Sequence, residues 1–196
     1  MSATDVKRRA ALGAPNRRRV VAVIGSGTIA DPACDEVGRL IATLGFDLLT
    51  GGGSGVMAAV SRAFFQTPSR QGVVIGVVPA AVSSLDALEA HEPSDVEYAP
   101  PSGYPNDWVE IAIYTHLPAT GTEGRHRMSR NHINVLSADA IVALPGQEGT
   151  QAEMWLATQY GVPIVAYGDH DAGLEPSIPR ARSLEELSSF LRGSIP

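Results

Sequence analysis

The sequence predicts an α/β fold in which helices cover both faces of a mainly parallel sheet. Short apolar runs typical of buried parallel strands alternate with longer helical segments along the chain. Three of the strand segments, at 20–24, 46–50 and 140–144, run into a glycine-rich turn that leads to a helix. This alternation, with short turns between the elements, indicates a single three-layer sandwich.

The first half of the chain contains three predicted strands and two predicted helices. The strand at 20–24 is followed by a helix whose cap and first turn are Asp31 and Pro32 and which Gly45 stops. The segments predicted after this helix are the strand 46–50, the helix 56–65 and the strand 73–78.

The second half begins with a long irregular segment and then resumes the alternation. Proline and glycine residues interrupt any pattern at 81–107, apart from a short helix predicted near 84–90, and a loop of this length is typical of a lid or binding loop. The segments predicted after it are a strand at 108–114, a helix at 124–136, the strand at 140–144, a helix capped by Thr150, a strand at 164–167 and a final helix from Ser183 to near Arg192.

The composition predicts one domain and excludes some classes of partner. With 196 residues, 44% hydrophobic and 18% charged, the chain suits a single domain over 20–196. Its formal net charge of −6 argues against nucleic acid as the main partner. The basic residues that cluster, at 7–9 and 17–19, lie in a predicted flexible tail at 1–19 and are expected to be a solvated arm.

The sequence carries no signal for a membrane, a disulfide or a metal. We expect a cytoplasmic protein with no membrane partner, because no apolar run resembles a signal peptide or reaches bilayer length. Cys34 is the only cysteine, which excludes an intrachain disulfide and a cysteine-based zinc site. His126 and His132 are six residues apart and would lie on different faces of a helix, so no shared metal is predicted.

The glycine turns predict a binding site for a phosphorylated small molecule such as a nucleotide. Each turn presents free backbone N–H groups at a helix N-terminus, where anions bind. All three turns would lie along the carboxyl edge of one sheet, where open α/β folds bind ligands. The residues predicted to contact the ligand are Gly25, Ser26, Gly52, Gly53, Gly55, Val56, Met57, Asn131, Pro145, Gly146, Gly149 and Thr150.

The first turn resembles the start of a dinucleotide-binding motif, but the rest of that motif is incomplete. Ala30 occupies the position of the third glycine. The second strand ends in Thr50 and glycines where a carboxylate for the ribose hydroxyls is expected, and Asp47 lies too early on that strand. The sequence therefore disfavours NAD binding.

Three separated motifs resemble the signature of the LOG-type phosphoribohydrolases, long described as lysine decarboxylases. These motifs are GGGSGVM at 51–57, an arginine at Arg130 and PGQEGTQAE at 145–153, which is similar to the family pattern PGGxGTxxE. The resemblance implies a Rossmann-like fold and a homodimer or higher homo-oligomer. It also implies that Arg130 and Glu153 are catalytic in hydrolysis of the N-glycosidic bond of a nucleoside 5′-monophosphate, with no cofactor required.

Other segments resemble the molybdenum-cofactor carrier proteins, a neighbouring branch with the same fold. NDWVEIAI at 106–113 is similar to their NxxVDIxI segment, and Arg130 with Asn131 is similar to their Arg-Asn pair. This resemblance implies a ligand that is held and not cleaved, either the molybdenum cofactor or a signalling nucleotide. The sequence leaves both functions open.

The chemistry of Arg130 and Glu153 fits hydrolysis, although each residue also has a simpler interpretation. Cleavage of an N-glycosidic bond develops positive charge on the ribose, which a fixed carboxylate stabilises while an arginine clamps the phosphate or fixes the carboxylate. Alternatively, Thr150 and Glu153 form a capping box, and Arg130 lies on the surface of a helix. Gln147 and Glu148 depart from the family pattern and would narrow the pocket or weaken phosphate binding.

Overall fold

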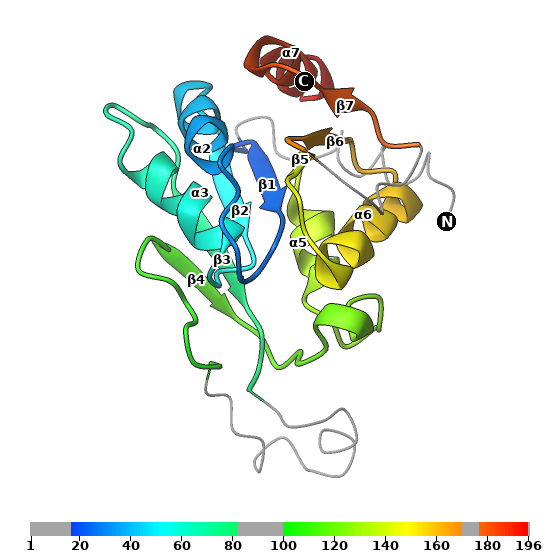
Figure 1. Ribbon diagram of the computed structural model, residues 1–196. Coiled ribbons are helices and arrows are strands. Elements are labelled where there is room, and N and C mark those ends of the chain that lie inside the picture. The colour runs from blue at the N-terminus through cyan, green and yellow to red at the C-terminus, as the bar shows by residue number, and fades with distance from the viewer. Residues whose placement is uncertain (1–16, 82–99, 170–176, 196) are drawn as a thin grey trace.

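The computed structural model describes residues 17–81, 100–169 and 177–195, and it confirms the predicted α/β fold. The strands are β1 (Val20–Ile24), β2 (Asp47–Thr50), β3 (Val74–Val78), β4 (Ile111–Tyr114), β5 (Ala140–Ala143), β6 (Ile164–Tyr167) and β7 (Arg180–Ala181). The helices are α2 (Cys34–Thr43), α3 (Val56–Phe65), α5 (Asn131–Ser137), α6 (Glu148–Tyr160) and α7 (Leu184–Ser194), with a 3₁₀ turn, η2 (Gly121–Glu123). The strands form one parallel sheet in the order β4-β3-β2-β1-β5-β6-β7 (Figure 1).

Two apolar cores separate the three layers. On one face of the sheet, Val21 and Val23 of β1 pack with residues of α2, α3 and α7. On the other face, Ala22 and Ile24 pack with residues of α5 and α6. Figure 1 shows α2 and α3 on one side of the sheet and α5 and α6 on the other. Since successive side chains of a strand point to opposite faces, the central strand β1 is apolar throughout.

The strand order creates a topological switch point beside β1. From β1 the chain moves outward through β2 and β3 to β4 and then crosses back to β5, on the other side of β1. In an open α/β sheet such a point leaves a crevice at the carboxyl ends of the strands, which is the usual place for a ligand. The turns after β1 and β5 border this crevice.

The strand predicted at 108–114 is shorter because an asparagine turn uses its first backbone groups. The side-chain oxygen of Asn106 accepts a hydrogen bond from the N–H of Trp108, and the Asn106 carbonyl accepts one from the N–H of Val109. These N–H groups are therefore not available to the sheet, and β4 begins at Ile111.

The helix predicted at 124–136 is also shorter. At Gly124 the chain packs against α6 so closely that a Cβ would lie 2.8 Å from the Cβ of Ala152. The chain turns again before α5, where the hydroxyl of Ser129 accepts a hydrogen bond from the N–H of Asn131. The helix begins only at Asn131.

The ends of the chain agree with the prediction in part. Ser183 caps α7 by accepting a hydrogen bond from the N–H of Glu186, as expected. Asp31 instead closes the turn before α2 by accepting from the N–H of Ala33, which is the N-cap position. The short strand β7 was not predicted, because two residues carry no periodic signal. The helix predicted near 84–90 lies outside the described residues.

Three carboxylates connect the strands at the amino edge of the sheet. Each accepts a hydrogen bond from the N–H of a residue at or beside a strand start: Asp139 from Val20, Asp47 from Val73 and Glu110 from Val74. Each also pairs with arginine: Asp139 with Arg17 and Arg19, Asp47 with Arg18, and Glu110 with Arg70. The solvated arm predicted for the basic tail is therefore wrong for residues 17–19, which are ion-paired with the domain, and the rest of that tail lies outside the described residues.

A membrane span is absent from the part of the chain that the structure describes, where every helix is too short or too polar to cross a bilayer. The cytoplasmic location stays a prediction.

We expect Asp47→Ala to lower the free energy of unfolding by about 1–3 kcal/mol, because it removes a buried carboxylate and leaves the part-buried N–H of Val73 and the Arg18 guanidinium without their acceptor. Urea unfolding measures this difference. The control is Asp35→Ala, which removes half-exposed ion pairs with Arg39 and Arg62 and should cost less than about 1 kcal/mol. Equal losses in the two variants would show that the Asp47 carboxylate stabilises the fold no more than an exposed ion pair does.

Candidate ligand-binding site at the switch point

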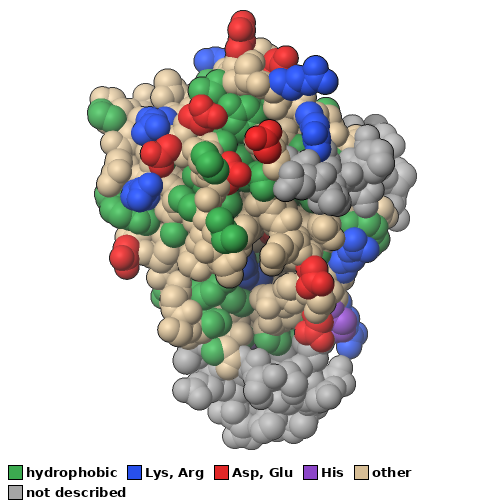
Figure 2. Space-filling view, in the orientation of Figure 1, with side chains coloured by type: hydrophobic (Ala, Val, Ile, Leu, Met, Phe, Trp, Pro, Cys, Tyr) green, Lys and Arg blue, Asp and Glu red, His purple; other side chains and the backbone are tan. Residues whose placement is uncertain are grey.

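The turns that follow β1, β2 and β5 border a cavity of about 230 Å³ at the carboxyl edge of the sheet. It lies at the switch point between β1 and β5. Figure 2 shows a hollow in the middle of one face of the molecule, with the blue of a Lys or Arg side chain at its base. Arg130 is the one basic residue among the described residues that line the cavity.

Hydrogen bonds fix the three turns to one another. The N–H of Ser26 donates to the carbonyl of Pro145 at 3.0 Å, and the carbonyl of Ser26 accepts from the N–H of Val56 at 2.9 Å. The hydroxyl of Ser54 donates to the carbonyl of Gly27 at 2.6 Å. The turn after β1 is therefore held from both sides. The first N–H of α3 is used within the protein and is not offered to a ligand.

Glycines allow this close approach of the turns. Gly55 has a φ of 62°, a conformation that favours glycine, and a Cβ there would lie 2.7 Å from the carbonyl carbon of Gly27. A Cβ at Gly25 would lie 2.8 Å from both γ-carbons of Val56. The absence of side chains at these positions thus sets the distance between the turns after β1 and β2.

The N-terminus of α6 forms one wall of the cavity and carries unused hydrogen-bond donors. The helix begins at Glu148 with Gln147 as its N-cap, so Thr150 is not the cap that the sequence predicts but a buried residue of the first turn. Within the described chain, the N–H groups of Glu148, Gly149 and Thr150 donate to no protein acceptor. Together with the positive end of the helix dipole, these groups suit an anion.

Arg130 adds a positive charge to the same cavity. Its side chain is buried, with the residue only 6% exposed, so the alternative of a surface helix residue is wrong. Its Nε and Nη1 atoms are buried and have no hydrogen-bond partner among the described residues. Burying a charged donor without a partner is costly, and an anionic ligand would remove this cost.

The guanidinium of Arg130 lies against a glycine and an aromatic ring. A Cβ at Gly51 would overlap Nη1 and would lie 2.7 Å from Cζ. The Cζ atom of Arg130 is 5.8 Å from the centroid of the Tyr104 ring, within the range of a cation–π contact. Neither contact gives Nε or Nη1 a hydrogen-bond acceptor.

Glu153 lies on α6 and lines the same cavity. Its Oε1 accepts a hydrogen bond from the Nδ2 of Asn134, on α5, at 3.0 Å. Burial raises the pKa of the Glu153 carboxyl, and the charge of Arg130 and the bond from Asn134 lower it only in part. The capping-box alternative is wrong, because the N-cap of α6 is Gln147 and Glu153 bonds to the neighbouring helix.

The remaining reactive side chains of the described chain do not form a second reactive centre. No group of three or more His, Cys, Asp and Glu residues could hold a metal ion in this part of the chain. Cys34 is buried in the core, and burial raises the pKa of its thiol to about 11, so it stays protonated at neutral pH. His132 bonds to the hydroxyl of Tyr160 at 2.6 Å and to the carbonyl of His126 at 3.0 Å.

Only some of the residues predicted to contact a ligand line the cavity. Those that line the cavity, together with Arg130 and Glu153, are Gly25, Ser26, Met57, Asn131, Gly149 and Thr150. Those that do not line it and instead lie in the turns behind are Gly52, Gly53, Gly55, Val56, Pro145 and Gly146. Contact of any of these residues with a ligand stays a prediction.

Tyr104 is the main lining residue that the sequence did not reveal. It lies in the segment predicted to be irregular, where no periodicity marks it. The signal that could have found it is Asn106, whose N–H and side-chain amide donate to the carbonyls of Gly52 and Gly53 at 2.8 and 2.9 Å. These bonds bring the ring over Gly53, where a Cβ would lie 2.6 Å from the Tyr104 Cζ. Other lining residues that were not predicted as ligand contacts are Val23, Ile24, Gly27, Thr28, Gly51, Thr120, Gly121, Gln147 and Glu148.

Comparisons with known proteins identify one family and several similar structures. A family model described as the SLOG cluster4 family matches residues 18–187. The chain is similar to the molybdenum cofactor binding protein from the phototrophic bacterium Rippkaea orientalis, at 26% identity and a TM-score of 0.66 over 91% of this chain and 98% of that one. It is also similar to the molybdenum cofactor carrier protein from Chlamydomonas reinhardtii, at 27% identity and a TM-score of 0.63 over the same shares of the two chains. No curated protein matches the sequence.

We expect Glu153→Gln to stabilise the protein at neutral and higher pH. Because the pKa of Glu153 is raised in the folded state, the wild type loses stability as pH rises through that pKa, whereas glutamine stays neutral. The melting temperature of the variant should therefore exceed that of the wild type above this pKa and converge with it near pH 4. The exposed Glu185, on α7, provides the control Glu185→Gln, which should show no such trend. A variant that is less stable than the wild type at every pH would contradict the assigned direction.

Proposed function

This chain belongs to the SLOG cluster4 family, and on that basis we propose that its cavity binds a nucleotide-type ligand through a phosphate group. The observation that carries the proposal is the buried guanidinium of Arg130, whose Nε and Nη1 lack partners among the described residues. A phosphate offers several strong acceptor oxygens in a geometry that a guanidinium matches with two hydrogen bonds.

The N-terminus of α6 strengthens the case for phosphate. The N–H groups of Glu148, Gly149 and Thr150 border the cavity that Arg130 also lines, so one anion could contact both groups of donors. Gly149 leaves room for a close approach, because the nearest atom to a Cβ there would be 3.9 Å away. The exposed carboxylate of Glu148 opposes this attraction and disfavours a second negative group at the helix terminus.

We infer that the reaction at this site is hydrolysis of the N-glycosidic bond of a nucleoside 5′-monophosphate. Water adds to C1′ as the C1′–N bond breaks, and the bonding electron pair leaves with the base. The proton lost by the water reaches the base nitrogen by way of Glu153, whose carboxylate also stabilises the positive charge on the ribose. The raised pKa of Glu153 suits this exchange, because it makes the carboxylate a better proton acceptor than an exposed glutamate. The products are the free base and ribose 5-phosphate.

Carriage of the molybdenum cofactor is the second candidate function. The observation that favours it is the similarity to two molybdenum cofactor proteins over 98% of their chains, at 26% and 27% identity. A carrier needs the same phosphate-binding groups but no turnover. Gln147 and Glu148, exposed residues that line the cavity, are the departures from the hydrolase pattern that fit this alternative.

We expect Glu153→Ala to lower the release of base from a nucleoside 5′-monophosphate by a factor on the order of a hundred or more, while much of the ligand affinity remains. Arg130→Ala should weaken the binding of AMP or inorganic phosphate by about ten- to a hundredfold, because charge-assisted hydrogen bonds are lost. Chromatography of free base measures the first effect, and titration calorimetry measures the second.

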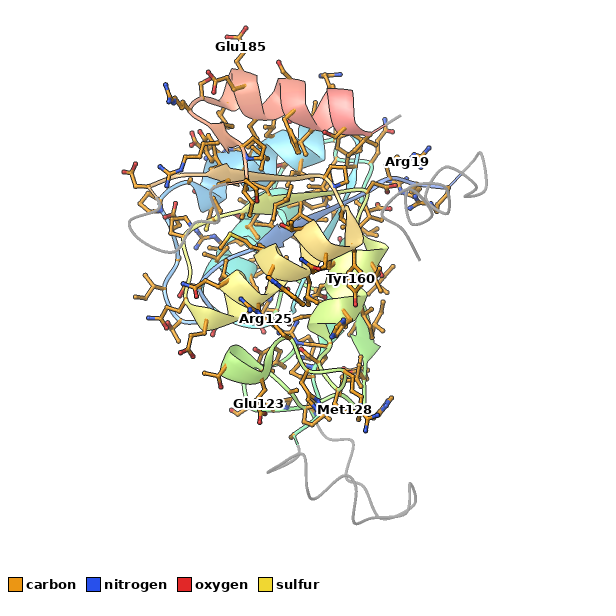
Figure 3. All side chains as sticks on the ribbon, turned by 90° about the vertical axis from the view of Figure 1, so that its right-hand side faces the viewer. Arg19, Glu123, Arg125, Met128, Tyr160 and Glu185 are labelled. Carbon is orange, nitrogen blue, oxygen red and sulfur yellow. The ribbon has the colours of Figure 1, made fainter. Side chains whose placement is uncertain are left out.

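Matched controls for these variants lie on α7. Glu185→Ala and Arg192→Ala change exposed residues of the same types and should alter neither readout. Figure 3 shows Glu185 at the opposite end of the molecule from Glu123 and Met128, which belong to the segment between β4 and α5. If the wild type releases no base from any common nucleoside monophosphate, and mass spectrometry of the denatured protein detects a bound pterin, carriage replaces hydrolysis as the function.

Self-association as a homodimer or higher homo-oligomer, which the family resemblance implies, also remains a proposal. The apolar residues of α3 are largely buried against the sheet and α2, so they do not form a free surface. Exposed apolar side chains gather instead on the edge strand β4, at Ile111, Ile113 and Tyr114. Ile111 and Ile113 pair with Ile75 and Val77, which puts them on the same face of the sheet as α5.

We expect light scattering to give about twice the chain mass of 20.6 kDa for the wild type at micromolar concentration. Ile113→Lys should shift the protein toward the monomer, because it places a charge on the exposed apolar face of β4. The control is Ile29→Lys, which places the same charge on an exposed apolar residue away from the edge strand. A wild type that stays monomeric would overturn the proposal.

A further inference from the structure

We propose that Tyr104 is a positioning residue that holds the Arg130 guanidinium ready for the phosphate, and this inference rests on the proposed function. Other arginines of this chain are held by ion pairs, as Arg70 is by Glu110 at the amino edge. Arg130 has no ion pair among the described residues, and its Nε and Nη1 have no hydrogen bond there. The contact with the ring of Tyr104, 5.8 Å from Cζ to centroid, therefore supplies a constraint that leaves the donors unused.

The backbone around Tyr104 has little freedom to move away from Arg130. Asn106 binds the carbonyls of Gly52 and Gly53 with its N–H and its side-chain amide, which fixes the loop to the turn after β2. The ring lies so close to Gly53 that a Cβ at that glycine would be 2.6 Å from the Tyr104 Cζ. The same turn therefore seats both the ring, over Gly53, and the guanidinium, over Gly51.

The ring face suits a positioning role better than an ion pair would. A carboxylate beside Arg130 would occupy the N–H groups that a phosphate needs and would repel the phosphate itself. An aromatic face attracts the cation through its π electrons without an ion pair, and Nε and Nη1 of Arg130 keep no hydrogen-bond partner among the described residues. The hydroxyl of Tyr104 is not required for this contact, which separates the ring from the phenol in a test.

The test compares Tyr104→Leu with the conservative variant Tyr104→Phe. We expect Tyr104→Leu to weaken the binding of inorganic phosphate and AMP by about three- to thirtyfold, in the range of a partly desolvated cation–π contact, and Tyr104→Phe to retain wild-type affinity. Titration calorimetry measures both. Tyr114→Leu is the matched control, because Tyr114 is an exposed tyrosine of β4 that does not line the cavity.

A second readout needs no ligand. Phenylglyoxal modifies accessible arginines, and peptide mass spectrometry reports the rate at each one. We expect Tyr104→Leu to speed the modification of Arg130, while Arg70, held by Glu110 and stacked on Phe65, serves as the internal reference for general loosening of the fold. Tyr104→Phe and Tyr114→Leu should leave both rates unchanged.

The two readouts separate failure of this inference from failure of the proposed function. A wild type that binds neither phosphate nor AMP would overturn the proposed function and the positioning role with it. A wild type that binds, combined with a Tyr104→Leu variant of unchanged affinity and unchanged Arg130 protection, would overturn only the role of Tyr104. Equal acceleration at Arg130 and Arg70 would also overturn it, because the ring would then act on the fold as a whole.

Discussion

The buried guanidinium of Arg130 is the constraint on which the rest of the site depends. A cation inside a protein costs several kcal/mol unless other groups compensate it, and the described residues give this one no hydrogen bond at Nε or Nη1. The guanidinium instead packs against the backbone of Gly51 and lies near the ring of Tyr104. Native proteins keep few unpaired buried groups, so such a donor set at a switch point is best explained by a ligand.

The amino edge of the sheet carries ion pairs that stabilise the fold, whereas the carboxyl edge carries the candidate site. At the amino edge, Asp47, Glu110 and Asp139 each accept an N–H at or beside a strand start and each pair with an arginine, so charge is compensated within the protein. At the carboxyl edge, glycine turns pack closely and leave helix N–H groups and Arg130 without acceptors. The burial that raises the pKa of Glu153 belongs to the same edge. The three carboxylates of the amino edge are thus paired within the protein, whereas Nε and Nη1 of Arg130 at the carboxyl edge are not.

Local patterns predicted most of the fold, and long-range contacts explain what they missed. Apolar runs located β1, β2, β3, β5 and β6. The resemblance to the LOG-type pattern paired Arg130 with Glu153, and both residues line one cavity in the structure. Tyr104 could not be placed, since its position depends on hydrogen bonds from Asn106 to a turn about fifty residues earlier. The pairing of residues 17–19 and the start of α6 at Glu148 likewise depend on partners and backbone geometry that the local sequence does not encode.

The most direct measurement is a ¹H–¹⁵N correlation spectrum of the arginine side chains, recorded while AMP or inorganic phosphate is added. The resonance of the Arg130 Nε–H is assigned by its absence in Arg130→Lys. If this guanidinium binds the phosphate, the resonance should shift downfield and saturate with the ligand, while that of Arg70, already paired with Glu110, stays in place. An Arg130 resonance that does not move at a concentration where calorimetry shows saturation would contradict the assignment of Arg130 as the phosphate-binding residue.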